Sequence, residues 1–294
     1  RFLGRAWRKP IDSETAEKWF QHFKKIRTQE NSSIYALRET LATSLASTNF
    51  LYLSEPKPNE SKSAVLTSHE LAARLSYFIW SSMPDDELRT LADQNRLNDS
   101  KVLTMQIKRM LRDPKSNRFA EEFSKQWLDL GGVDRVAVNP RYHQNFDNRL
   151  KPYMQAESLE FFKEIFRKDL PITKLIDADF TMLNARLAKH YGLKGPKSQN
   201  FERTSLKGTN RDGGILGHAS IHLSGSDGAE SHPIRRAVWV RERLLHDPPK
   251  PPPPDVPGIE ESVLDFEKLS LHEQLELHRK KESCNDCHRT LDPW

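Results

Sequence analysis

The stretch TSHELAARLSYFIWSSMPDDEL, residues 67–88, sets the character of the chain. Thr67 and Glu70 have the spacing of a capping box, in which each side chain bonds the other residue's backbone N–H at the start of a helix. The apolar residues that follow recur on one helix face: Leu71, Leu75, Phe78 and Ile79. A proline and three acids at residues 84–87 predict a second helix start, because acids are favourable near a helix N-terminus.

Apolar residues at helical spacing recur on both sides of this stretch. Upstream, Asp12 is placed to cap a helix, and two stripes follow it: Trp19, Phe20, Phe23 and Ile26, then Ile34, Leu37, Leu41 and Leu45. The longest candidate helix spans residues 147–168, and Pro233 is placed to start another. Strand-like alternation is rare. The predicted fold class is therefore mainly α, a body of many helices.

The composition suits a globular protein with a charged surface. Of the 294 residues, 36% are hydrophobic and 30% are charged, and the formal net charge is +5. Basic residues are interleaved with acids and no nucleic-acid reader motif is present, so nucleic-acid binding is not expected. No stretch approaches the length of about 18 apolar residues that a membrane span needs, so no transmembrane segment is expected. No signal peptide is recognisable at the start of the sequence.

The two cysteines of the chain lie in one short segment, Cys284-Asn285-Asp286-Cys287-His288. This pattern is the attachment signature of a c-type haem. Each thiol adds to one vinyl group of the porphyrin, and the neighbouring imidazole binds the iron. The segment predicts haem c bound covalently to Cys284 and Cys287, with His288 as the proximal ligand. Covalent haem attachment occurs outside the cytoplasm, so a periplasmic or otherwise exported protein is expected.

Two other chemistries use cysteines at this spacing. A redox or structural disulfide between Cys284 and Cys287 would not need His288. A zinc ion needs four ligands, so His278 or another histidine would have to complete the set. In the haem interpretation His278 is expected to pack or hydrogen-bond near the haem rather than bind its iron.

A glycine- and serine-rich region at residues 211–231 contains or borders three histidines, His218, His222 and His232. It contains no Gly-Lys-Ser/Thr, so a phosphate loop is not supported. His218 is the preferred candidate for the sixth iron ligand, because its flanking glycines allow the backbone to approach closely. Ligation by a methionine sulfur, from Met182 or Met83, is the alternative. Glu157 lies beside the apolar stripe of its helix, and a satisfied core hydrogen bond is its favoured role.

A proline-rich run at residues 248–257 (PPKPPPPDVP) cannot form a helix and is expected to be an extended linker. Beyond it, Ser270 and Glu273 repeat the capping-box spacing and predict a helix that leads toward the cysteines. The predicted organisation has three parts: an N-terminal helical domain at residues 1–58, a central helical domain at 66–195, and a C-terminal domain at 205–294 with the haem motif at 284–288.

Several segments resemble one family of bacterial proteins. They are residues 2–10 (FLGRAWRKP), 70–88, 179–184 (DFTMLN), 187–192 (LAKHYG), 213–257 and 284–293. Together they resemble the planctomycete-type exported cytochrome-like proteins of unknown function, and the Arg-Leu-Ser-Tyr-Phe block is the most specific of them. The resemblance implies a multi-domain protein in which Cys-x-x-Cys-His follows the polyproline run. It gives no role to His222 or His232, where family members often have apolar or hydroxyl residues.

Three function classes remain open from the sequence. The leading hypothesis is an exported c-type cytochrome that carries electrons to a redox partner protein. The second is a haem enzyme of peroxidase or oxygenase type, for which His218 or Glu157 could supply the distal acid or base. The third is a cell-surface scaffold or a polysaccharide-processing component in which the haem is secondary.

Overall fold

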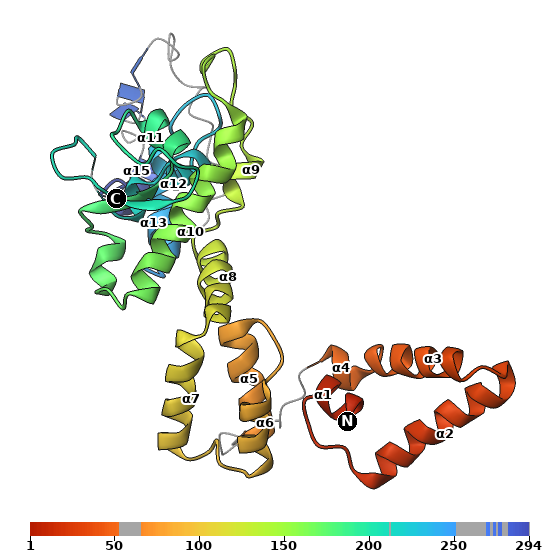
Figure 1. Ribbon diagram of the computed structural model, residues 1–294. Helices are drawn as coiled ribbons and strands as arrows, with labels where there is room; N and C mark the ends of the chain where they lie inside the picture. Colours follow the sequence, from red (N-terminus) through yellow and green to blue (C-terminus); the bar gives the residue numbers. More distant parts are fainter. Residues whose placement is uncertain are drawn as a thin grey trace. The chain divides into compact units, whose positions relative to one another are not determined.

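The computed structural model describes residues 1–52, 66–211, 213–250, 269–270, 273–274, 276–277 and 282–293. The chain divides into two compact units, Arg1–Phe119 (unit 1) and Ala120–Trp294 (unit 2). Helices predominate in both units, so the prediction of a mainly α fold is confirmed (Figure 1). Among the described residues, no helix is both long and apolar enough to cross a membrane.

Unit 1 is built of helices in sequence order. They are α1 (Phe2–Ala6), α2 (Ser13–Glu30), α3 (Ser33–Leu45), α4 (Thr48–Leu51), α5 (Ser68–Trp80), α6 (Asp86–Asp93), α7 (Ser100–Arg112), the 3-10 turn η1 (Pro114–Ser116) and the start of α8 (Asn117–Trp127). Helices α2 and α3 form a hairpin, and α5 lies beside α7 (Figure 1).

The helix starts of unit 1 follow the local signals in the sequence. The Asp12 side chain accepts a bond from the Thr15 N–H at the start of α2. Thr67 and Glu70 form the complete capping box of α5. Asp85 accepts from the Leu88 N–H at the start of α6. These three predicted helix starts are confirmed.

The two parts of unit 1 differ in how they bury apolar side chains. A core forms around Trp80, which is fully buried and donates its indole N–H to the Met110 carbonyl at 3.0 Å. By contrast, Ile34 and Leu37 on α3 are 84% and 53% exposed, so most of that stripe does not enter a core. The periodicity of α3 identified a helix but not a buried face.

Unit 2 mixes helices with one small sheet. Its elements are α9 (Gly132–Arg135), η2 (Asn148–Leu150), α10 (Lys151–Arg167), η3 (Ile172–Leu175), β1 (Phe180–Leu183), α11 (Ala185–Tyr191), β2 (Glu202–Ser205), η4 (Ile215–Gly217), α12 (Ala219–Ser224), α13 (Pro233–Arg243) and α15 (Glu282–Leu291). Its main apolar core packs α10 against β1, with Phe161 and Phe180 at ring centroids 5.2 Å apart.

Strands β1 and β2 pair in antiparallel register, from Phe180 opposite Ser205 to Leu183 opposite Glu202. All four residues of β1 are buried, so the strand lacks the alternation that marks a half-exposed strand. This explains why the sequence pattern did not predict it.

Two glycines of the glycine-rich region let the chain pass close to the backbone of residues 175–178. A Cβ atom on Gly213 would lie 1.5 Å from the Ala178 carbonyl oxygen, and one on Gly214 would lie 2.2 Å from that of Ile176. Gly214 also has φ of 90°, which favours glycine. This close approach leads the chain through η4 to His218 in the interior of unit 2.

The segment before α15 is described only in part. Residues 248–250 have no regular secondary structure, and the rest of the predicted polyproline linker, residues 251–257, lies outside the described residues, as does His278. Ser270 and Glu273 bond each other's backbone N–H, at 3.4 Å and 2.8 Å, so the second predicted capping box is present.

Candidate functional site

Helix α15 carries the Cys-x-x-Cys-His segment. Positions 284, 287 and 288 all fall within Glu282–Leu291. Their spacing of three and four residues places these backbone positions on one face of the helix. Two thiols and an imidazole on one helix face are the donor set that a covalent haem requires, so the residues of α15 fit that group.

His288 is oriented by an acid at the end of the same helix. Its side chain is 7% exposed, and Nδ1 lies 2.9 Å from Oδ1 of Asp292. The carboxylate accepts a hydrogen bond, so Nδ1 carries the proton. A metal-binding histidine commonly has such a carboxylate partner, which fixes the ring and makes Nε2 the coordinating nitrogen. The pair thus has the arrangement of an oriented metal ligand.

A buried arginine holds the second half of α15 against α13. Arg241 is 9% exposed and donates to the Thr290 hydroxyl at 3.0 Å and to the Asp247 carboxylate at 2.6 Å. Leu291 is buried as well, with 6% of its surface exposed. These contacts fix the end of the helix that carries His288.

A second cluster of chemically capable side chains lies in the core of unit 2. Six polar residues from α10, β1, α11 and the start of α12 form one hydrogen-bonded chain, which we call the buried network: Glu157, Ser158, Thr181, Tyr191, His218 and Ser220. Glu157 and His218 are 1% and 2% exposed. The cluster is therefore closed to water.

One half of the buried network is centred on His218. Nδ1 of His218 lies 2.9 Å from the Ser158 hydroxyl, which lies 2.6 Å from the Ser220 hydroxyl. Nε2 has a longer contact of 3.4 Å with the Thr181 hydroxyl. One proton arrangement satisfies all of them: Ser220 donates to Ser158, Ser158 donates to Nδ1, and Nε2–H donates to Thr181.

The other half is centred on Glu157. Its carboxyl group accepts from the Thr181 hydroxyl at 2.7 Å and from the Tyr191 hydroxyl. The Tyr191 oxygen in turn accepts from the Ala219 N–H at 3.0 Å. Arg211 lies over the Tyr191 ring, 3.8 Å from its centroid. The favoured role of Glu157, a satisfied core hydrogen bond, is confirmed.

Burial dominates the protonation of the network. Loss of solvation raises the pKa of Glu157 to about 7, although its bonds from Tyr191 and Thr181 act in the opposite direction. Burial lowers the pKa of His218 to about 3, with help from the charge of Arg211. His218 is therefore neutral at physiological pH. Burial and the neighbouring Glu157 raise the pKa of Tyr191.

His218 was the predicted sixth ligand, and the network engages both of its ring nitrogens. Iron binding by His218 would require one of these contacts to be replaced, so that role stays a prediction. Of the alternatives, Met182 is 7% exposed and Met83 is 43% exposed. Within the described parts of the chain, no three His, Cys, Asp or Glu side chains gather in a way that could hold a metal ion.

The other two histidines of the region have separate partners. Nδ1 of His222 lies 3.3 Å from Arg236, and Nε2 of His232 lies 2.9 Å from the Asp227 carboxylate. The sequence had not pointed to Thr181, Ser158, Ser220, Tyr191 or Arg211. Tyr191 lies in the family-like segment LAKHYG, which was the one sequence signal near any of them.

Comparison with known proteins gives three matches to family models. They are PSD5, a protein of unknown function (DUF1595), at residues 1–55; PSD4, a protein of unknown function (DUF1592), at residues 66–193; and PSCyt3, a protein of unknown function (DUF1588), at residues 212–294. These are the planctomycete cytochrome-like (PSCyt) domain families, in agreement with the resemblance of residues 70–88. No curated protein and no solved structure matches the chain.

Proposed function

We propose that this chain of three cytochrome-like family domains is an exported c-type cytochrome that transfers electrons to a redox partner protein. Cys284 and Cys287 would anchor the haem, and His288 would be the proximal ligand. The haem would supply the one-electron chemistry, as in other c-type cytochromes. The chain would position it through α15.

The observation that carries this proposal is the His288–Asp292 pair on the helix with the two cysteines. The distance of 2.9 Å from Nδ1 to the carboxylate fixes one tautomer of the imidazole. A carboxylate partner also makes the opposite nitrogen a stronger electron donor to a metal. Asp292 would therefore stabilise oxidised iron and keep the reduction potential low.

Arg241 would support the same site from α13. Its bond to Thr290 joins α13 to the residue two positions after His288. The buried guanidinium limits rotation of the helix end and so keeps the imidazole in place. This is a positioning role, since Arg241 makes no contact with His288 in the described structure.

A haem enzyme of peroxidase or oxygenase type is the second candidate, and the same pair favours it. A more basic proximal ligand donates electron density to the iron, which assists cleavage of an O–O bond in haem enzymes. A carrier needs a filled sixth position, whereas an enzyme needs an open one. The two candidates therefore differ in a property that spectroscopy reads directly.

An absorption spectrum of the protein purified from a haem-maturing host tests the proposal. The carrier is expected to give a reversible, low-spin, six-coordinate centre with the bands of a c-type haemochrome. A five-coordinate, high-spin spectrum with peroxide turnover would support the enzyme instead. Protein with no haem after maturation, or with one equivalent of zinc, would overturn both. Affinity for a polysaccharide without redox activity would favour the scaffold.

A further inference from the structure

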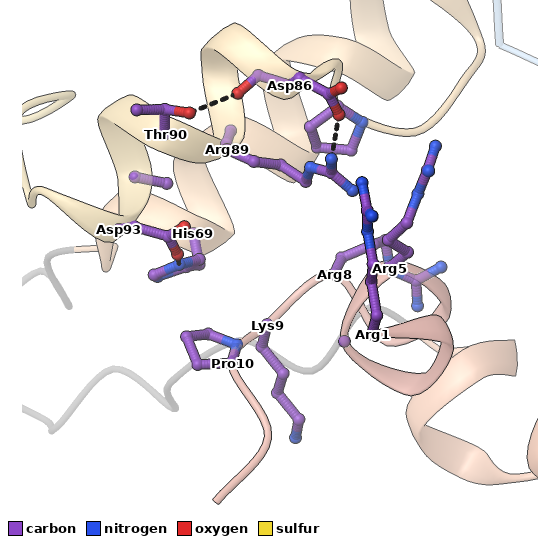
Figure 2. Close-up of a pocket in the computed structure, with 14 residues that line it drawn as sticks. Arg1, Arg5, Arg8, Lys9, Pro10, His69, Asp86, Arg89, Thr90 and Asp93 are labelled. Carbon is purple, nitrogen blue, oxygen red and sulfur yellow. Dashed lines mark hydrogen bonds and ion pairs between the residues drawn. The ribbon is translucent and has the colours of Figure 1, made fainter.

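A pocket of about 370 Å³ lies within unit 1, away from the cysteine segment (Figure 2). One wall is α1 and the turn that follows it, and the other is formed by the starts of α5 and α6. Its lining is strongly basic, with five cationic side chains: Arg1, Arg5, Arg8, Lys9 and Arg89. Two carboxylates, from Asp86 and Asp93, also line it.

The two carboxylates are already engaged on their own side of the pocket. Asp86 pairs with Arg89 one helical turn away, and Asp93 lies 2.8 Å from Nε2 of His69 (Figure 2). They are therefore poorly placed to neutralise the arginines of the opposite wall. The lining keeps an excess of positive charge.

Arg8 and Lys9 build the wall rather than the free part of the lining. Nη2 of Arg8 donates to the carbonyls of Asn49 at 3.0 Å and Phe50 at 2.9 Å. Nζ of Lys9 donates to the Asn49 side chain at 2.9 Å. Arg8 also has φ of 58°, an unusual conformation for a residue with a side chain, and its carbonyl partners hold it there. These bonds give the pocket a fixed edge.

Arg1 and Arg5 remain as exposed guanidinium groups at that edge. Neither pairs with an acid among the described residues. Figure 2 shows the Arg1 side chain extending toward Arg89, so like charges face each other across the opening. Crowded guanidinium groups without a counter-charge repel one another, and an anion between them would relieve the repulsion.

We propose that this pocket binds an oxoanion group, with Arg1 and Arg5 as its principal ligands and Arg89 as a third. A guanidinium matches two oxygens of a sulfate, phosphate or carboxylate group at once. The volume of about 370 Å³ lies within the range of small-molecule sites, so the pocket can hold an anionic sugar residue as well as a bare ion. The two sources share one chemistry and differ in size.

The experiment titrates the full-length chain with three probes by calorimetry at low ionic strength. The probes are sodium sulfate, a sulfated disaccharide and the same disaccharide without sulfate. Binding of the sulfated probes and not of the uncharged sugar is expected. Tighter binding of the sulfated disaccharide than of sulfate would identify a sugar as the source, and equal binding would identify the free ion. Failure of all three probes to bind would overturn the proposal.

A pair of double variants separates a site from general attraction. Arg1→Gln with Arg5→Gln removes two charges from the pocket and is expected to weaken binding about tenfold or more. Arg27→Gln with Arg112→Gln removes the same charge from exposed positions outside the pocket, on α2 and α7, and is expected to leave binding nearly unchanged. Equal weakening by both double variants would overturn the proposal. The outcome does not depend on haem.

Discussion

Two buried histidines of unit 2, His218 and His288, lie in opposite surroundings. His218 has hydroxyl groups against both ring nitrogens and belongs to a chain of six polar side chains. His288 has a single carboxylate, Asp292, against Nδ1 at the end of α15. Hydroxyl partners on both sides hold a neutral imidazole within a core. A carboxylate on one side makes the other nitrogen a better donor, which is what a metal ligand needs.

The comparison separates structural from functional burial. Burial of His218 serves the packing of α10, β1 and α12, and each polar atom is satisfied within the protein. Burial of His288 protects one hydrogen bond on a helix that also carries two cysteines. The difference leads us to expect that changes at the two sites will affect different properties. Haem content and redox chemistry belong to α15, and folding stability belongs to the buried network.

The largest expected effect comes from the cysteines. Replacing Cys284 and Cys287 by alanine should abolish covalent haem completely, because the thioether bonds have no other source of sulfur in the chain. A pyridine haemochrome assay of protein after acid–acetone extraction measures this. His218→Ala is the matched control and should retain covalent haem. Retention of haem by the cysteine variant would break the comparison at its functional end.

The next effect is a pH dependence of stability that originates in Glu157. Its pKa is raised to about 7 from 4.5, so the fold favours the protonated acid. The stabilisation is complete below about pH 4.5 and is lost as the pH rises through 7, with a total of roughly 3 kcal/mol. His218 acts in the opposite sense, because its lowered pKa stabilises the fold above about pH 6.5 and the contribution is lost toward pH 3.

Glu157→Gln isolates the first of these contributions. The stability difference between wild type and the variant should fall as the pH rises from about 4.5 to 7, by roughly 3 kcal/mol. Urea denaturation at several pH values measures it, and Glu160→Gln, on the same helix but only half-buried, is the control. A difference that stays constant with pH would show that Glu157 is ionised in the fold at all these values.

A smaller effect is expected from His218→Ala. The substitution leaves the Ser158 and Thr181 hydroxyls without a buried partner and opens a cavity beside Phe161, so it should cost about 2 to 3 kcal/mol of stability. The control His232→Ala, at a more exposed position, should change stability by less than about 0.5 kcal/mol. The absorption spectrum of the same variant tests the predicted iron ligation by His218. A shift from low-spin to high-spin would show that the comparison misassigned this histidine.

The smallest effect sharpens the other side. Asp292→Asn removes the negative charge on Nδ1 of His288 and should raise the reduction potential, by about 59 mV for each tenfold change in the reduction equilibrium. Covalent haem should be retained. Asp247→Asn removes a carboxylate that bonds Arg241 instead, and its potential should change less. Equal shifts in the two variants would show that Asp292 acts only as a distant charge.

The parts of the fold that the sequence predicted are those set by neighbouring residues. Asp12, Thr67 and Glu70 act within one helical turn, so their capping roles could be read directly. The strand β1 could not, because burial of all four residues removes its alternation. The exposed stripe of α3 shows a related limit, since periodicity does not reveal whether a partner covers a face.

The candidate sites divide in the same way. The haem segment is contiguous, and its spacing alone was sufficient to identify it as a candidate. The buried network joins residues between 24 and 62 positions apart, such as Glu157 with Thr181 and Ser158 with Ser220, so no local pattern could show it. The position of Asp292 four residues after His288 was visible, but its bond required the end of the helix to be formed.

The most direct test of the central claim is the intact mass of the denatured protein purified from a haem-maturing host. We expect the wild type to be heavier than its sequence mass by one haem, and the variant lacking Cys284 and Cys287 to have its sequence mass. Wild-type protein that carries no added haem from a host that matures other c-type cytochromes would contradict the claim.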